Sequence, residues 1–522
     1  MGRHLTPTFS QDLAAVLAGP LIHQLADDLA GMFPRRRRHP VALLLGYLAL
    51  QRAIGSANRL DAELAVGEVW HRAVGLYNAA AHLHGDHTIG VHLSPPTADT
   101  FRHIRDRLTH PDHLPALAAA FTTRAVETAI AIGLLPDRGG SRTHPSPLRT
   151  LYGDGTIIRP LYRHDNPGRA DPDIALHHRH DGTWWGNNLV LTYCRGPRPH
   201  RRVILGIDRV HQPGREADTA VGLFSRIVEI AGDRAQAIVY DGALRGTHHN
   251  QLMHTTGCLV LTKVHAAARR DGTKIARTIP LTTRHHHPDA APCSHTLVIH
   301  DGAIHDSSID SHGQLQLGEP LDRHQVRRYR TRTGYRFSLG IHIACPREPF
   351  TAWISPHPHA DQLRLLPETD PDFAALYGLR NDAESNNNSY KATLPSRRAA
   401  ALGWRRQLLD AIGWAILINS RAYARHGPSQ PRSLLEPTSP DPLGTLLTGT
   451  ADHQRRPSTA TAAPSPRAGS ALIAWLARLL AAHPPSRPRK TSRRVTDHRP
   501  PADTSRRVSG HDVARSDERR AP

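Results

Sequence analysis

Three acidic residues that lie far apart in the chain could together bind metal ions: Asp154, Asp241 and Glu384. The apolar runs LYGDG and IVYDG place Asp154 and Asp241 where a strand is expected to leave its sheet, and ligands collect at such edges. Glu384 lies 143 residues beyond Asp241, in the polar segment YGLRNDAESNNNSYK. Converging carboxylates repel one another unless cations neutralise them. Hard oxygen ligands favour Mg²⁺ or Mn²⁺ over zinc, and we expect two such ions per site.

Two cations held in this way could activate an attacking oxygen and stabilise the leaving oxygen at one phosphodiester. At roughly 100° per residue, three further side chains share a narrow helical stripe with Glu384. They are Tyr377, Arg380 and Lys391. The two cations would contact adjacent phosphates, and the tyrosine would add a hydrogen bond or a stacking contact. The alternative is a solvated helical face with an Arg380 to Glu384 pair, worth only about 0.2 to 0.5 kcal/mol.

Asp-Gly pairs also have a purely structural explanation, because they favour tight turns. The chain contains five of them, with the aspartate at 154, 181, 241, 271 and 301. Asp301, in LVIHDG, is the closest rival of Asp241. We favour Asp241 because a helical pattern precedes its strand and another follows it, as a parallel βαβ core requires.

Residues 1–145 are predicted to form a helical region. The strands and helices that must position the acidic residues come after it in the chain. The helical periodicity of residues 1–145 is carried by SQDLAAVLAGPLIHQLADDLAGMF, VALLLGYLALQRAIG, TADTFRHIRDRLTH and PALAAAFTTRAVETAIAIGLL. Two basic features there could contact a DNA backbone or could be solvated: the run PRRRRHP, and the helix with Arg102, Arg105 and Arg107.

Strand patterns begin at residue 146. The order is three strands (LRTLYGDGTII, NLVLTYCRG, RRVILGIDRV), a helix (EADTAVGLFSRIVEIAG), a strand (AQAIVYDG), a short helix and a last strand (CLVLTKV). This order indicates an α/β sheet with helices packed on its faces over residues 146–264. We expect a β-rich insertion over 265–360 and helices again over 361–425. Residues 426–522, rich in Pro, Arg and Ser, are predicted to be mostly disordered, with a short helix at 469–483 that could dock on a partner or on its own chain.

The amino-acid composition indicates which class of partner the protein binds and which cellular compartment it occupies. The net charge of +20 and the pI near 10.7 favour an anionic partner, with nucleic acid first. Four scattered cysteines without a C-x-x-C pair fit reduced cytosol, and we find no signal peptide and no run of 18 apolar residues. The clusters HHRH (His177 to His180) and RHHHPD (Arg284 to Asp289) lack zinc-site spacing, so they are interpreted as solvated loops.

At the helical stripe the sequence resembles a known family. The spacing Y-x2-R-x3-E-x6-K is met in full by Tyr377, Arg380, Glu384 and Lys391, and it looks like the hallmark of the YREK-type DDE transposases, cut-and-paste bacterial enzymes. The resemblance covers roughly residues 147–425. It implies a ribonuclease-H-like mixed sheet with a β-rich insertion between the second aspartate and the glutamate. The 143 residues between Asp241 and Glu384 leave room for such an insertion.

The resemblance also implies an activity and partners. It implies metal-dependent cleavage of DNA at transposon ends and joining of the freed 3′-hydroxyl to target DNA, within a protein dimer that holds both ends. A tryptophan of the insertion can stack near a flipped base in this family, which makes Trp353 a candidate, although a buried core position is the alternative. Lys263, after the strand CLVLT, is a candidate DNA contact or a merely exposed lysine. The expected location is cytoplasmic, on the nucleoid when DNA is bound.

Two other functions fit the same residues. One is a transposon-derived protein that binds DNA without catalysis, although the presence of all three carboxylates argues against obvious decay. The other is a nuclease with the same fold, whose reaction stops at hydrolysis. The recognised DNA ends, the target preference and the choice between hairpin and other cleavage routes are not encoded in any motif that we identify.

Overall fold

The structure is a computed structural model, and it describes residues 8–34, 37–179, 182–198, 200–264, 278–287 and 290–428. These residues belong to one compact unit that runs to Pro440. The tail that was expected to be disordered, with its helix at 469–483, lies outside the described residues.

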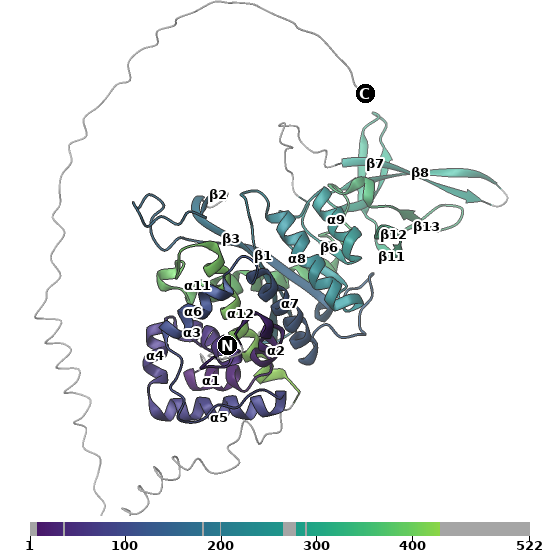
Figure 1. Cartoon of the computed structure of the whole chain (residues 1–522). Coiled ribbons are helices and arrows are strands. Elements are labelled where there is room, and N and C mark those ends of the chain that lie inside the picture. Colours follow the sequence, from purple (N-terminus) through teal and green to yellow (C-terminus); the bar gives the residue numbers. More distant parts are fainter. Residues whose placement is uncertain are drawn as a thin grey trace, which may run out of the picture. The chain divides into compact units, whose positions relative to one another are not determined.

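The described N-terminal part is helical (Figure 1). Its helices are α1 (Phe9–Leu17), α2 (Leu21–Asp28), α3 (Val41–Ile54), α4 (Ala57–Leu64), α5 (Gly67–His84), α6 (Ala98–Leu108) and α7 (Leu114–Ala131). Helix α3 is apolar on all sides and buried along almost its whole length, as expected for a helix inside a core. The expected helical region is therefore present, and it includes two helices, α4 and α5, whose segments had not been singled out from the sequence.

A six-stranded mixed sheet follows (Figure 1). Its strands are β1 (Thr150–Ile158), β2 (Ala175–Arg179), β3 (Gly182–Arg195), β4 (Arg202–Arg209), β5 (Ala237–Val239) and β6 (Leu259–Leu261). The order is β4-β3-β1-β5-β6, with β2 paired to the outer part of β3. Strands β3 and β4 run antiparallel to their neighbours, while β1, β5 and β6 are parallel and are connected through helices. The chain is thus a mixed α/β protein with the strand and helix order that the sequence predicted, apart from the additional β2.

The register of the three parallel strands lines up residues that are distant in sequence. Tyr152 pairs with Val239, and Val239 pairs with Leu261. Two residues beyond each of these positions, on the same side of each strand, come Asp154, Asp241 and Lys263. Strand pairing alone therefore carries two carboxylates and one ammonium to neighbouring places at one edge of the sheet.

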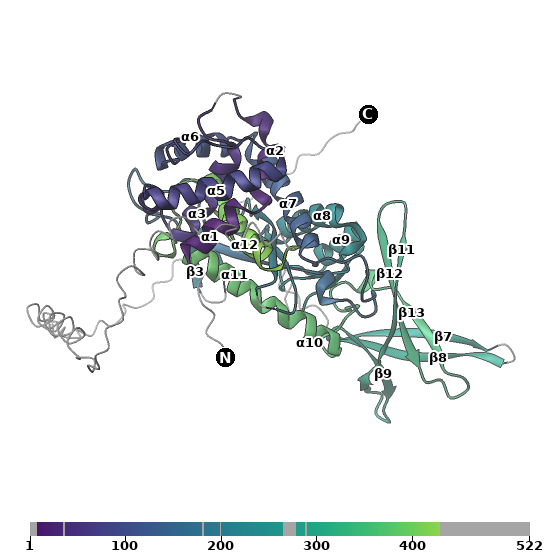
Figure 2. The ribbon, with the colours of Figure 1, turned by 90° about the horizontal axis from the view of Figure 1, so that it is seen from below.

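Helices cover both faces of this sheet. Helix α8 (Glu216–Ala231) packs beneath β1, where a Cβ on Gly153 would lie 2.8 Å from the ring of Phe224. Because successive residues of a strand alternate between faces, Asp154 points to the opposite face, which helix α11 (Asp382–Ala392) covers. Helix α9 (Thr247–Thr256) connects β5 to β6. Figure 2 shows α11 near α12 (Trp404–His426), and the ring centroids of Tyr390 and Trp414 from these two helices lie 5.5 Å apart.

The expected C-terminal helical segment is divided. It consists of α10 (Pro371–Gly378), a 3₁₀ turn η5 (Leu379–Asn381), α11 and α12 (Trp404–His426). The stripe predicted from one uninterrupted helix is therefore wrong for Tyr377 and Arg380, which precede the start of α11. The hydroxyl of Tyr193 donates hydrogen bonds to the carbonyl oxygens of Leu379 and Arg380, both at 3.3 Å, and so fixes the turn on the sheet.

Helix α12 protects the outer strand of the sheet. The side chain of Asn419 accepts a hydrogen bond from the backbone N–H of Ile204 and donates one to its carbonyl oxygen, both at 2.8 Å. Both residues are fully buried. The amide of Asn419 thus replaces the partner strand that β4 lacks at this point, and it satisfies groups that would otherwise be costly to bury.

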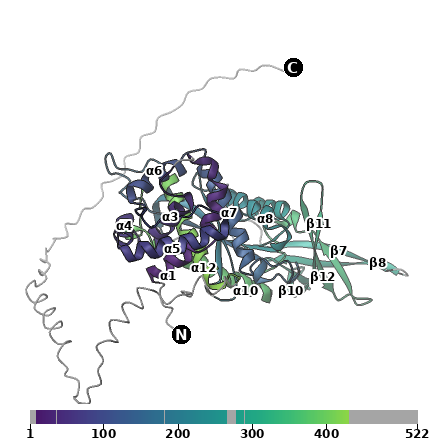
Figure 3. The ribbon, with the colours of Figure 1, turned by 60° about the horizontal axis from the view of Figure 1, so that its bottom comes forward.

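Two smaller sheets form the β-rich insertion (Figure 3). The first has the order β10-β9-β8-β7 and the second β11-β12-β13. Their strands are β7 (Thr278–His287), β8 (Ala290–His300), β9 (Ala303–Ile309), β10 (Leu315–Pro320), β11 (Arg323–Arg330), β12 (Tyr335–Ile343) and β13 (Phe350–Ile354). Short 3₁₀ turns elsewhere are η1 (Ala30–Met32), η2 (Pro147–Arg149), η3 (Gly232–Arg234), η4 (His357–His359) and η6 (Pro395–Arg397).

Three local expectations are corrected. Asp154 lies in the middle of β1 rather than where the strand ends, because β3 continues to pair with β1 on the other side. The cluster HHRH begins on strand β2, where His177 is buried and its Nε2 lies 3.2 Å from the carbonyl oxygen of Gly186. The cluster RHHHPD begins on strand β7, with its last two residues outside the described ones. Neither histidine cluster is a solvated loop.

None of the helices that the structure describes has both the length and the hydrophobicity needed to cross a bilayer.

Replacing Asn419 should show how far the core depends on its bonds to β4. We expect Asn419→Leu to lower the free energy of unfolding by about 2 to 6 kcal/mol, because it leaves one buried N–H and one buried C=O unpaired, at about 1 to 3 kcal/mol each. The measurement is chemical denaturation, with the exposed residue Asn381→Ala as the control. Equal stability of the two variants would contradict the assigned role.

Candidate active site

The two aspartates at the sheet edge contact the same guanidinium group. Arg380 Nη2 lies 2.9 Å from Asp154 Oδ1 and 3.8 Å from Asp241 Oδ2. Asp154 is almost fully buried and Asp241 is partly exposed. The parallel register of β1 and β5 brings the carboxylates together, and turn η5 places Arg380 over both. From the sequence, Arg380 was expected to contact a phosphate or to pair with Glu384; in the fold it pairs with the two aspartates.

The pKa of Arg380 is set by two opposing effects. Burial lowers the pKa of Arg380, but the nearby carboxylates of Asp154 and Asp241 raise it more, so the pKa lies above its ordinary value. One guanidinium cannot neutralise two carboxylates. Two carboxyl groups therefore share one guanidinium, and their formal charges exceed its own.

Asp154 has a second partner on helix α11. Asn387 Nδ2 donates a hydrogen bond of 2.9 Å to Asp154 Oδ2. The other amide atom of Asn387, Oδ1, is buried and has no hydrogen-bond partner among the described residues. Burying an unpaired oxygen is costly, so this atom is an available ligand beside the most buried carboxylate of the group.

Asp241 is held by the turn that follows β5. Its Oδ1 accepts a hydrogen bond of 2.9 Å from the backbone N–H of Ala243, and its carbonyl oxygen accepts one from Leu244. This local turn explains why the residue after the strand is an aspartate, and it leaves Oδ2 directed toward Arg380. The structural and the functional explanations of this Asp-Gly pair are therefore compatible. Asp301, the rival, joins β8 to β9 in a hairpin.

Glu384 is in the first turn of α11, and its side chain is exposed. The buried residues of this helix are Ala383, Asn386, Asn387 and Tyr390, of which Asn387 contacts Asp154. The oxygens of Asp154, Asp241 and Glu384 do not form a group within 4.8 Å of one another, although all three residues are described. The structure thus joins the two aspartates and leaves the glutamate outside their group.

Tyr377 and Lys263 lie next to this group. The ammonium of Lys263 lies 5.6 Å from the centre of the Tyr377 ring, and the guanidinium carbon of Arg380 lies 5.8 Å from it. The ring of Phe373 stacks on the ring of Tyr377, with centroids 4.9 Å apart. Lys263 also forms an ion pair of 3.0 Å with Glu368 and remains about half exposed. Two cations and an aromatic ring therefore border the carboxylates.

The two remaining candidate DNA-binding residues, Lys391 and Trp353, lie in different parts of the fold. Lys391 is in the last turn of α11 and is partly buried. Trp353 is on strand β13 of the insertion, where it is 38% exposed and Arg327 covers its ring at 3.7 Å. The alternative of a buried core tryptophan is therefore wrong for Trp353. Its exposed, cation-stacked ring leaves an aromatic surface on the insertion.

One acidic residue near the site was missed from the sequence. Glu216 is the first residue of α8, beneath Gly155, and it accepts hydrogen bonds from Asn188 Nδ2 at 2.7 Å and from the hydroxyl of Tyr240 at 3.1 Å. Burial raises its pKa above the ordinary value, and the charges of Asp241 and Asp154 raise it further. Acidic residues are common in the first turn of a helix, where they interact favourably with the helix dipole. The sequence therefore gave no indication that Glu216 is buried.

Divalent cations fit this donor set. The carboxylates of Asp154 and Asp241 and the unpaired Oδ1 of Asn387 are hard oxygen ligands, which suit Mg²⁺ or Mn²⁺. A bound cation would balance the formal charge that Arg380 leaves over, which also contributes to the raised pKa of Glu216. Glu384 could add a fourth oxygen from its neighbouring position on α11.

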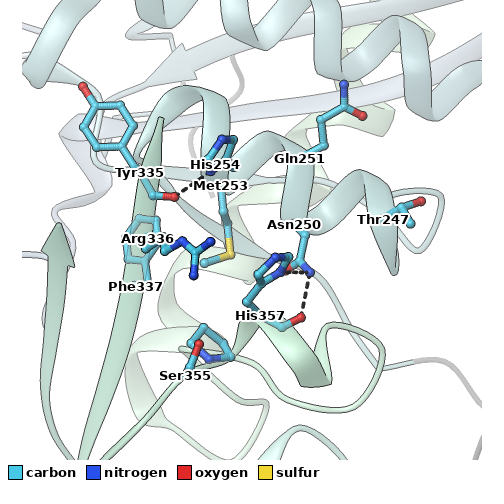
Figure 4. Close-up of a pocket in the computed structure, with 11 residues that line it drawn as sticks. Thr247, Asn250, Gln251, Met253, His254, Tyr335, Arg336, Phe337, Ser355 and His357 are labelled. Atoms are coloured by element: carbon cyan, nitrogen blue, oxygen red, sulfur yellow. Dashed lines mark hydrogen bonds between the residues drawn. The ribbon is translucent and has the colours of Figure 1, made fainter. Parts of the chain in front are cut away.

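One pocket of the described residues lies away from the carboxylates. It is about 380 Å³ in volume and lies between α9 and β12, lined by residues such as Met253 and Phe337 (Figure 4). His254 Nδ1 lies 3.0 Å from the carbonyl oxygen of Tyr335 on one side of it, and Asn250 bonds to His357 on the other. No carboxylate lines this pocket, so it is not a second site of the same chemistry.

Comparisons with known proteins give no matching family and, among solved structures, a distant match. No protein-family model and no curated protein matches the chain. A cryo-EM structure of a piggyBac transposase synaptic complex with hairpin DNA aligns with 88% of this chain and 87% of that chain, at 10% identity and a TM-score of 0.24. A TM-score this low does not establish a shared fold, and we base the function on the residues of the site.

The raised pKa of Glu216 predicts a pH-dependent effect of its amide variant. Because the folded-state pKa is raised, the contribution of Glu216 to stability is full below the unfolded pKa and is lost as pH rises through the folded value. We expect Glu216→Gln to have a higher Tm than the unmodified protein at pH 7 and a smaller advantage near pH 4. Asn188 can turn its amide to accept from the new glutamine, because its Oδ1 is buried without a partner.

Thermal unfolding across this pH range is the measurement, and Glu229→Gln on the exposed side of α8 is the matched control. A difference in Tm between Glu216→Gln and the unmodified protein that is the same at pH 4 and pH 7 would show that Glu216 is not buried beside the aspartates.

Proposed function

We propose that the protein is a DNA transposase that uses divalent cations to cleave DNA at the ends of a mobile element and to join the freed 3′-hydroxyl to target DNA. The observation that carries this proposal is the contact of Asp154 and Asp241 with one guanidinium at the edge of the sheet. The strand order β4-β3-β1-β5-β6, with the first three strands antiparallel and the others parallel, supports a ribonuclease-H-like catalytic core.

In this proposal Asp154, Asp241 and Glu384 hold two Mg²⁺ or Mn²⁺ ions. When bound, the ions supply an activated attacking oxygen and charge stabilisation for the leaving oxygen. The side chain of Asn387 positions Asp154 through its 2.9 Å hydrogen bond. The buried carboxyl of Glu216 adds negative potential from the opposite face of β1, which favours cation binding.

The remaining residues would position the nucleic acid. Arg380 contacts a phosphate when cations take over the neutralisation of the aspartates, and Lys391 contacts the next phosphate along the helix. Lys263 and Tyr377 border the same edge and offer a charge and a ring face. Trp353, exposed on the insertion, would stack on a base. The net charge of +20 fits a DNA partner, and a homodimer would hold the two element ends.

A DNA-binding protein without catalysis is the second candidate. It is favoured by the contact that Arg380 makes with both aspartates, since a guanidinium there already supplies the carboxylates with a positive charge. Glu384 also remains outside the carboxylate group. A nuclease with the same site differs from a transposase only in the absence of joined products.

The cleavage reaction tests the three proposed cation ligands. We expect the purified protein with Mg²⁺ to cut and join DNA that carries the segments flanking its coding region. Asp154→Asn, Asp241→Asn and Glu384→Gln should each reduce cutting at least about 100-fold while DNA binding persists, since even second-shell changes around a metal cost 10- to 100-fold. Gel analysis of nicked and joined strands is the measurement.

The exposed residue Asp306→Asn is the control for this series. Full cutting by any one of the three variants would remove that residue from the site, while nicks without joined products would identify a nuclease.

Arg380→Ala tests whether a cation and the guanidinium neutralise the same carboxylates. Without Arg380, Asp154 and Asp241 repel each other, so we expect a lower Tm in the absence of metal and a larger rise in Tm on adding Mg²⁺ than the unmodified protein shows. Arg59→Ala, on exposed α4, should behave like the unmodified protein. An equal response of both variants to Mg²⁺ would place the cation site elsewhere.

A further inference from the structure

A second cluster of metal-binding side chains lies in the insertion, away from the carboxylates. It comprises His285, Cys293, His295 and Cys345, and one ligand atom of each lies within 4.8 Å of every other. The Sγ atoms of Cys293 and Cys345 are 3.6 Å apart, and Cys293 Sγ lies 3.0 Å from His295 Nε2. Both cysteines are free thiols. This is the one such group of three or more potential ligands found in the part of the chain that the structure describes.

Strand geometry explains how three of the four meet. In the hairpin of β7 and β8, His285 pairs directly with Cys293. His295 follows Cys293 by two residues, so both point to the same face of β8. The alternation of β7 leaves His286 exposed on the other face. One face of a single hairpin thus presents two imidazoles and a thiol.

The fourth member comes from the other sheet. Cys345 lies two residues beyond the end of β12, in a tight turn where its N–H donates to the carbonyl oxygen of Ile343 at 3.0 Å. Arg347, in the same connection, donates a hydrogen bond of 3.0 Å to the carbonyl oxygen of Ala291 on β8. The segment between β12 and β13 is therefore held against the β7–β8 hairpin, with Cys345 directed at the cluster.

Packing around the cluster fixes the imidazole rings. Phe350, the first residue of β13, stacks on His285 with centroids 4.0 Å apart and planes 14° apart, and its ring centre lies 5.3 Å from that of His295. The Nδ1 atom of His285 is buried and has no hydrogen-bond partner among the described residues. Rings oriented by packing, with an unpaired nitrogen, are suited to bind an electron-pair acceptor.

We propose that this cluster is a structural zinc site. Two thiolates and two imidazoles form a Cys₂His₂ set, which zinc binds in tetrahedral geometry, and no carboxylate or water is needed to complete it. The sulfur ligands separate it from the all-oxygen site of the aspartates, which suits harder cations. His287, whose Nε2 lies 3.1 Å from Cys293 Sγ, is close enough to exchange with one of the two imidazoles or to bond to a ligating sulfur.

The site would connect the two small sheets of the insertion. Three ligands belong to the sheet of β7 and β8, and the fourth follows β12 of the other sheet. Within the described residues, no strand of one sheet is hydrogen-bonded to a strand of the other. Small sheets bury little apolar surface, and a metal that joins them supplies folding energy that their packing lacks. The zinc would therefore fix the orientation of the surface that carries Trp353.

Metal content of the full-length protein tests this proposal. We expect protein purified with a reducing agent from zinc-containing medium to hold one zinc ion per chain by elemental mass spectrometry. Cys293→Ser and Cys345→Ser should each lose it, and His286→Ala on the exposed face of β7 should keep it. The double variant Asp154→Asn and Asp241→Asn should also keep it, which separates this site from the proposed catalytic one.

Cobalt provides a second measurement that does not depend on a folded variant. Replacing the zinc of the unmodified protein with Co²⁺ should give the visible absorption of a tetrahedral thiolate-bound ion, and one equivalent of added zinc should abolish it. Absence of bound zinc would overturn the proposal, as would zinc content unchanged by the loss of both thiols. A Cys293–Cys345 disulfide in the metal-free native protein would identify the pair as a redox crosslink instead.

Discussion

The pairing of Asp154 and Asp241 with Arg380 is the interaction on which the candidate site depends. The two carboxylates come from strands that are in register, so their proximity follows from the pairing of β1 with β5. Like charges brought together at a partly buried edge raise the free energy of the folded state unless a positive charge accompanies them. Arg380 supplies that charge at 2.9 and 3.8 Å, and its pKa is raised by the contact.

The break between α10 and α11 makes this contact possible. Tyr193, stacked on Tyr152 of β1, bonds to the carbonyl oxygens of the 3₁₀ turn and so anchors it on the sheet. A polar helix such as α11 would gain little from hydrophobic burial, and its attachment depends instead on a few specific bonds, of which Asn387 to Asp154 is one. The polar character of this segment is therefore consistent with a role at the sheet rather than in solvent.

The insertion and the central sheet differ in how much apolar surface they bury. The central sheet is covered by helices and has a large apolar interior, whereas the two sheets of the insertion are short and exposed along much of their length. Cysteine and histidine side chains gather where the two small sheets meet, and hard oxygen ligands gather at the edge of the large one. The chain thus separates a soft-ligand site that would stabilise structure from a hard-ligand site that would perform chemistry.

The sequence by itself determined the order of the elements, the mixed α/β class and the choice of Asp241 over Asp301, because apolar periodicity and flanking helices are local properties. It also indicated Asp154 from its place in an apolar strand pattern, and Arg380 and Glu384 from the spacing of a motif. The tertiary structure alone decided what the long-range contacts are. Glu216 beneath Gly155, the exposure of Trp353 and the meeting of His285 with Cys345 depend on strand register and on packing between distant segments. The histidine run on β7 was misinterpreted for the same reason. Its thiol contacts, Cys293 on β8 and Cys345 more than 50 residues further along the chain, depend on strand pairing and on packing between the two small sheets.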